Sequence, residues 1–175
     1  MLDRVAVITK PRSKLESRSV WPLPHQYDLN PTVFERAVAD PDRLAVDIGY
    51  DSIHPRRSPF VPVFAVQDGT IAHVEKTGRG YAITLDHGHW FTSYSELEHA
   101  FVMNRSTTTR RRERVRAGDI LGYVKWSAHV RFELWEFDNE GQLVPVDPEP
   151  HLRRWVVLPD LEQPVKIAAV DAVAA

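Results

Sequence analysis

The chain has 175 residues, a formal net charge of −2 and no cysteine, and 43% of its residues are hydrophobic. This length is sufficient for one domain with a sizeable buried core. The near-neutral charge gives no electrostatic reason to expect a nucleic-acid or anionic-membrane partner, and the lack of cysteine excludes disulfides and thiolate metal sites.

The N-terminal segment contains only a short apolar patch, which Asp3, Arg4 and Lys10 interrupt. Such a segment resembles neither a secretory signal peptide nor a membrane-spanning helix. We therefore expect a protein without a membrane span that is made in the cytoplasm. A role outside the cell would then require another route, such as lysis, a particle or a partner.

The composition divides the chain into three regions. We expect residues 1–43 to form an N-terminal extension that contains a short helix, residues 44–150 to form a β domain, and residues 151–175 to form a C-terminal extension. The best helix candidate is "PTVFERAVA" at 31–39, where Pro31 suits a first turn and Asn30 can cap it.

From about residue 44 the sequence predicts short strands and turns. The patterns indicate strands flanking an Asp-Gly turn in 62–76, two strands around His87-Gly88-His89 in 79–97, an apolar strand after a Gly-Asp turn in 115–124, and a half-buried strand in 128–137. The sequence therefore predicts an all-β fold, mainly antiparallel and rich in β-hairpins, with short helices.

Two further segments allow more than one interpretation. The charged run "NRSTTTRRRERVR" at 104–116 could bind phosphate or nucleic acid. A solvated loop is the favoured interpretation, because no aromatic residues interrupt the basic ones. The apolar tail from about residue 159 either packs on a partner or frays. We expect no nucleic-acid partner.

Several segments follow one another in a recognisable order, namely "WPLP" (21–24), "DIGYD" (47–51), "PVFAVQDGTI" (62–71), "GYAITLDHGHWFTSYSEL" (80–97), "VRAGDILGYV" (115–124), "SAHVRFEL" (127–134) and "VDP" (146–148). Their order resembles that of the lysostaphin-like, or LytM-type, zinc endopeptidases, which cut peptide cross-bridges in bacterial cell walls. The resemblance implies a β fold of the duplicated hybrid motif type.

The resemblance also implies where a zinc site would lie. In that family the zinc ligands are a His and an Asp in the first motif and a His in the last motif. The corresponding residues in this chain are Asp47, Asp51 and Arg131. Two further histidines of the family activate the attacking water, and their positions hold His129 and Glu96.

Arg131 is the decisive change. A guanidinium stays protonated and has no lone pair to donate, so it cannot replace a histidine ligand. Its planar fork can instead bridge two carboxylates. We therefore expect an ion-paired cluster of Asp47, Arg131 and Asp51 in place of the metal, with no bound cofactor and no catalytic residue.

Other histidines leave an alternative open. His87 matches a histidine position of the family, and His87 and His89 could form a partial zinc site. His87, His129 and Asp51 could also converge, which would give an active zinc metallopeptidase with atypical ligands. Glu96 and His129 form either an acid/base pair or, as the favoured interpretation, a polar pair without a reaction to serve.

Several aromatic side chains could retain binding without cleavage. The candidates for a peptide-binding groove are Trp90, Tyr94, Trp126 and Trp135. The favoured function is accordingly a catalytically inactive, endopeptidase-like domain with a structural or cell-wall-binding role.

The family's distribution favours a phage tail or baseplate, or a similar particle, so we expect a location in the virion. The expected partners are other structural proteins of that particle and peptidoglycan peptide. A pure scaffold, with the groove buried against a partner, is a further alternative.

Overall fold

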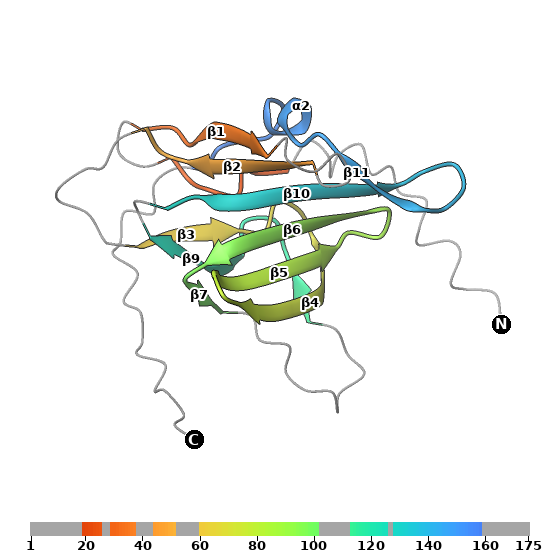
Figure 1. Ribbon diagram of the computed structural model, residues 1–175, viewed down its shortest axis with the longest axis horizontal. Coiled ribbons are helices and arrows are strands. Elements are labelled where there is room, and N and C mark those ends of the chain that lie inside the picture. Colours follow the sequence, from red (N-terminus) through yellow and green to blue (C-terminus); the bar gives the residue numbers. More distant parts are fainter. Residues whose placement is uncertain are drawn as a thin grey trace, which may run out of the picture.

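The computed structural model describes residues 19–25, 29–37, 44–51, 60–101, 113–125 and 128–158. Within these ranges it contains eleven strands and one short helix, α2 (Glu149–Leu152). Every pairing between named strands is antiparallel, and Figure 1 shows the arrangement. The predicted all-β, mainly antiparallel fold is confirmed.

The larger sheet has eight strands, and its path leads from β1 to β8. In spatial order the strands are β1 (Thr32–Ala37), β2 (Ala45–Gly49), β10 (Val130–Phe137), β6 (Trp90–Leu97), β5 (Gly80–Asp86), β4 (Gly69–Thr77) and β8 (Arg114–Val115). The eighth strand, β11 (Leu143–Val146), pairs with β10 beside this path.

The smaller sheet has three strands in the order β3 (Phe60–Phe64), β9 (Ile120–Lys125) and β7 (His99–Ala100). Its apolar residues join those of the larger sheet in one core. Val63 of β3 and Leu121 of β9 belong to the same buried cluster as Tyr94 of β6 and Phe132 of β10, and all four are almost completely buried.

Alternation along β10 explains how one sheet has two different faces. Val130, Phe132 and Leu134 are fully buried and form the core face. Arg131 and Trp135 alternate with them and therefore point to the opposite face, which we call the outer face. The half-buried strand that the sequence predicts over 128–137 is confirmed.

The helix predicted over 31–39 is wrong, because residues 32–37 form strand β1. The β-branched residues Thr32 and Val33 favour an extended backbone. Pairing with β2, from Thr32 opposite Gly49 to Ala37 opposite Ala45, then fixes that strand. The larger sheet therefore begins before residue 44.

The Asp-Gly turn at 68–69 connects two sheets and does not close a hairpin. The preceding strand, β3, pairs with β9, whereas the following strand, β4, pairs with β5 and β8. Gly69 lies so close to the β5–β6 turn that a Cβ atom would be 2.8 Å from both Asp86 O and His87 Nδ1. The predicted strands around His87-Gly88-His89, and after Gly118, are confirmed as β5, β6 and β9.

The two ends of the described chain pack together on the core. Val20 and Val156 form a parallel bridge, and the Trp21 indole donates a hydrogen bond of 2.7 Å to the Leu152 carbonyl. Leu152 is itself buried in the core cluster. Most of the charged run at 104–116 and the tail from 159 lie outside the described residues. In the part of the chain that the structure covers, no helix is long and apolar enough to cross a membrane.

Candidate functional site

Three neighbouring strands bring the expected ligand and catalytic positions to one end of the larger sheet. Arg131 on β10 lies directly opposite Asp47 on β2 and, on its other side, opposite Ser95 on β6. Directly opposed residues in a sheet point to the same face. The outer face at the start of β10 therefore presents Asp47, Arg131 and Ser95 side by side.

A two-pronged ion pair joins Asp47 and Arg131. The Arg131 Nε donates to Asp47 Oδ1 at 3.0 Å, and its Nη2 donates to Asp47 Oδ2 at 3.3 Å. The Arg131 and Asp47 side chains are 32% and 16% exposed. The pKa of Arg131 is raised above its ordinary value, chiefly by its hydrogen bonding to Asp47. The predicted pairing of these two residues is confirmed.

This arrangement does not fit a zinc ion. Both carboxylate oxygens of Asp47 accept hydrogen bonds from the guanidinium, and Arg131 offers no lone pair at the position where the family has its third ligand. In the described ranges, moreover, no group of three or more His, Asp or Glu residues is arranged to hold a metal ion.

The expected third member of the cluster lies apart from it. Asp51 follows the end of β2, is exposed, and accepts a hydrogen bond of 3.2 Å from the Thr32 hydroxyl. Among the residues that the structure describes, Arg131 forms its ion pair with Asp47. The prediction that Arg131 bridges both aspartates is therefore wrong, because Asp51 lies beyond the paired part of β2 and bonds to β1 instead.

Glu96 and His129 do not form the pair that the sequence suggested. Glu96 accepts a hydrogen bond of 3.3 Å from Arg79 and has a backbone φ of 66°, which is uncommon for a residue with a side chain. The His129 ring packs edge-on against Phe34, with 4.7 Å between ring centroids. Neither the acid/base pair nor the polar pair is present.

His87 lies at the other end of the sheet, in the turn after β5. Its Nδ1 is 2.9 Å from the Asp68 carbonyl, and its Nε2 is 2.9 Å from the Thr92 hydroxyl. Burial lowers the pKa of His87 below its ordinary value of 6.5. A neutral ring that donates from Nδ1 and accepts at Nε2 satisfies both contacts.

The Thr92 and Tyr94 hydroxyls are 3.2 Å apart, and Tyr94 accepts a hydrogen bond of 3.0 Å from the Val66 amide. His87 is thus the end of a buried network. Since both ring nitrogens are engaged, His87 is not available for the predicted zinc site with His89. It also lies too far along the sheet to converge with His129 and Asp51.

The four aromatic candidates have different surroundings. Tyr94 is completely buried, so its proposed role in a groove is wrong. Trp90 stacks on His87 with 4.4 Å between ring centroids, away from the Asp47–Arg131 pair. Trp135 lies on the outer face and donates from its indole to Glu133 Oε2 at 3.2 Å. Trp126 lies outside the described residues.

Sequence reasoning missed two residues near the ion pair. Glu133 is only 5% exposed although it shares the outer face of β10 with Arg131, and its charge contributes to the raised pKa of Arg131. Arg79 is the partner of Glu96. The alternation of the 128–137 strand could have placed Glu133 beside Arg131, whereas nothing local in the sequence connects Arg79 with Glu96.

Comparisons with known proteins agree with this fold. The sequence pattern that defines Peptidase family M23 matches residues 49–148, more than half of the chain. No curated protein sequence matches.

Among solved structures, a lytM glycyl-glycine endopeptidase candidate from Ruminococcus gnavus ATCC 29149 superposes with a TM-score of 0.56 at 16% identity. The match covers 82% of this chain, which spans only 62% of that one. A SpoIIQ–SpoIIIAH pore-forming complex matches with a TM-score of 0.53 at 16% identity, covering 90% and 98% of the two chains. A second SpoIIIAH–SpoIIQ complex matches at 0.52 and 17% identity, covering 76% and 99%.

Proposed function

Because the chain belongs to peptidase family M23, and an arginine–aspartate pair stands at two expected ligand positions, we propose that it is a catalytically inactive peptidase-like domain with a structural or cell-wall-binding role. The observation that carries this proposal is the pair of hydrogen bonds from Arg131 to Asp47. These bonds engage both oxygens of the carboxylate that would otherwise be available to a zinc ion.

The chemistry of the remaining side chains supports the same conclusion. Hydrolysis of a peptide bond needs an activated water and a group that stabilises the oxyanion. His129 packs against Phe34, and Glu96 is engaged by Arg79. The imidazole of His129 therefore has no hydrogen bond to Glu96 that would orient it as a general base.

The outer face still offers a surface for a peptide. Along β10 it presents Arg131 and Trp135, and along β6 it presents Ser93 and Ser95. An aromatic ring beside paired charges and hydroxyl groups can contact both the backbone and the side chains of an extended peptide. We take a peptidoglycan peptide as the ligand.

We further propose that the domain works in a phage tail, a baseplate or a similar particle, with other structural proteins as partners. Support comes from the two solved assemblies in which SpoIIQ is complexed with SpoIIIAH. The same fold therefore occurs in protein assemblies as well as in an endopeptidase candidate.

The deciding experiment combines zinc analysis with a hydrolysis assay. The purified chain is incubated with zinc, desalted and analysed for metal, and peptidoglycan digestion is followed beside the catalytic domain of lysostaphin as a positive control. We expect no stoichiometric zinc and no digestion. About one zinc per chain together with digestion would refute the proposal and establish an active peptidase with atypical ligands.

A second assay separates binding from a purely structural role. Sedimentation with insoluble peptidoglycan is compared between the wild-type chain and Trp135→Ala. Retention that Trp135→Ala weakens supports the cell-wall-binding role, whereas equal absence of retention leaves the structural role within a particle and rejects peptide binding.

A further inference from the structure

A cavity lies at the end of the sheet opposite the ion pair. It has a volume of about 650 Å³, and the residues that line it include Gln67, Trp90, Glu136, Arg154 and Trp155. Cavities that hold small ligands usually have volumes of about 300–1,000 Å³. Its size is therefore suitable for a small molecule or one unit of a polymer.

This cavity is separate from the expected catalytic position. Glu136 follows Arg131 by five residues on β10, which corresponds to about 16 Å along an extended strand. In Figure 1 the β5–β6 turn and the β10–β11 connection lie at one end of the sheet, and the start of β10 lies at the other. A ligand in the cavity would not touch the Asp47–Arg131 pair.

Aromatic rings form the apolar part of its wall. The centroids of the Trp90 and Trp155 rings are 6.0 Å apart, with an angle of 45° between the planes. His87 stacks behind Trp90 at 4.4 Å, and His151 lies 6.3 Å from Trp155. Both indoles are thus held by neighbouring rings, which keeps their orientation fixed before a ligand arrives.

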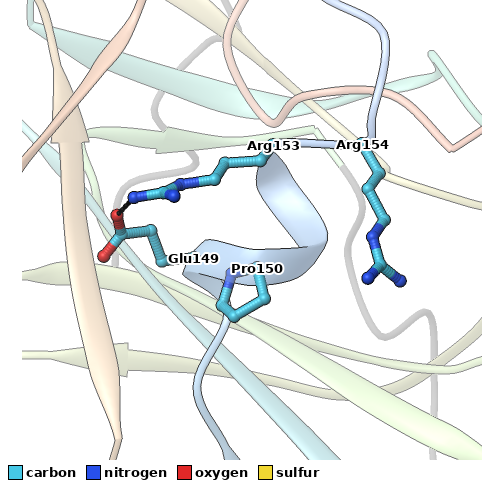
Figure 2. A pocket seen from close by; sticks show the side chains of 4 residues that line it. All are labelled: Glu149, Pro150, Arg153 and Arg154. Carbon is cyan, nitrogen blue, oxygen red and sulfur yellow. Dashed lines mark hydrogen bonds and ion pairs between the residues drawn. The ribbon is translucent and has the colours of Figure 1, made fainter.

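The polar part contains a cation without an ion-pair partner among the described residues, and an unsatisfied acceptor. Arg153 pairs with Glu149 at 2.6 Å, whereas the Arg154 side chain projects away from that pair (Figure 2) and makes no ion pair within the described residues. Gln67 is only 8% exposed, and its Oε1 is buried without a hydrogen-bond partner. A buried acceptor without a partner costs about 1–3 kcal/mol, and native structures contain few such groups.

We propose that this cavity binds a neutral sugar ring. A pyranose has apolar C–H faces that can cover the indole rings of Trp90 and Trp155, and hydroxyl groups around its edge that both donate and accept hydrogen bonds. A hydroxyl can donate to the Gln67 amide or to the Glu136 carboxylate and accept from Arg154. Side chains of both charge signs line the cavity, which disfavours a ligand with a net charge.

The inference does not depend on the proposed inactive role. It would stand if the outer face bound no peptide, and the inactive role would stand if no sugar bound here. The assay must therefore use soluble sugars, which contain no peptide.

The test is a titration of the full chain with the trisaccharides of N-acetylglucosamine and of glucose, followed by calorimetry and tryptophan fluorescence. We expect saturable binding of at least one of them. Gln67→Leu and Arg154→Ala should each weaken binding by about tenfold, the effect of losing one hydrogen bond of average to high strength. Arg153→Ala is the matched control, since Arg153 pairs with Glu149 outside this cavity, and it should bind like the wild type.

Gln67→Leu also separates binding from folding. It removes an acceptor that has no partner, so we expect its thermal stability to equal or exceed that of the wild type while its sugar affinity falls. The proposal is overturned if neither trisaccharide binds saturably. It is equally overturned if Arg153→Ala weakens binding as much as Arg154→Ala, or if a benzoate probe binds and the sugars do not.

Discussion

A double-mutant cycle on Asp47 and Arg131 tests whether their ion pair crosslinks β2 and β10. The single variants are Asp47→Asn and Arg131→Leu, and the third variant combines them. Leu retains part of the aliphatic volume of Arg131, and Asn retains the shape of Asp47 without its charge. The cycle then isolates the interaction between the two side chains from the separate effects of each substitution.

The structure sets the expected magnitude. Exposed ion pairs contribute about 0–1 kcal/mol, whereas breaking a buried pair costs about 3–5 kcal/mol. The Arg131 and Asp47 side chains are 32% and 16% exposed and form two hydrogen bonds. The cost of breaking this partly buried pair should lie between those two ranges. We therefore expect Arg131→Leu to lower the free energy of unfolding by about 2 kcal/mol, with a coupling energy of about 1–2 kcal/mol between the two side chains.

Urea unfolding followed by tryptophan fluorescence measures these free energies. For a chain of this size, about 2 kcal/mol also corresponds to a melting temperature lower by about 4–8 °C. Arg79→Ala is the control, because Arg79 pairs with Glu96 through a side chain that is 77% exposed. A coupling energy below about 0.5 kcal/mol, or equal effects of Arg131→Leu and Arg79→Ala, would refute the crosslink.

Three further substitutions test particular contacts. Glu96→Gly should raise the melting temperature, because glycine adopts the φ of 66° without a side-chain penalty; a lower melting temperature would contradict this. His87→Gln should reduce the pH dependence of stability, since the lowered pKa of His87 makes the wild type most stable above pH 6.5 and less stable as the pH falls below it; urea unfolding at pH 7.5 and 5.5 measures this, and an unchanged difference would contradict it. Tyr94→Phe should destabilise the fold by about 1–3 kcal/mol in the same assay, because it leaves the buried Val66 amide without its acceptor; an unchanged stability would show that the Val66 amide does not depend on this acceptor.

Local patterns predicted most of the strands but not the first one. On β10, buried Val130, Phe132 and Leu134 alternate with more polar residues, and this period identifies a strand without further information. Residues 31–39 carry no such pattern. The extended conformation of residues 32–37 depends on pairing with β2, a contact between strands that local propensity does not reveal.

The candidate site was predictable only as far as strand register determines it. Asp47 and Arg131 lie opposite each other because β2 and β10 are neighbours, and the family resemblance implied this neighbourhood. Asp51 follows the paired part of β2, so its direction depends on the chain beyond the strand. The direction of Glu96 depends on its positive φ, which the residue type disfavours and which only the assembled sheet imposes.

The geometry of the sheet explains why the ligand positions could change without loss of the fold. Asp47 and Arg131 project from the outer face, whereas their neighbours Val46, Ile48, Val130 and Phe132 fill the core. The contribution of core burial to the free energy of unfolding is therefore independent of which side chains lie on the outer face. The charge of each partner, however, constrains the other. A carboxylate at 47 without a cation, or a guanidinium at 131 without an anion, would leave a partly buried charge unpaired. The two residues are consequently stable as a pair.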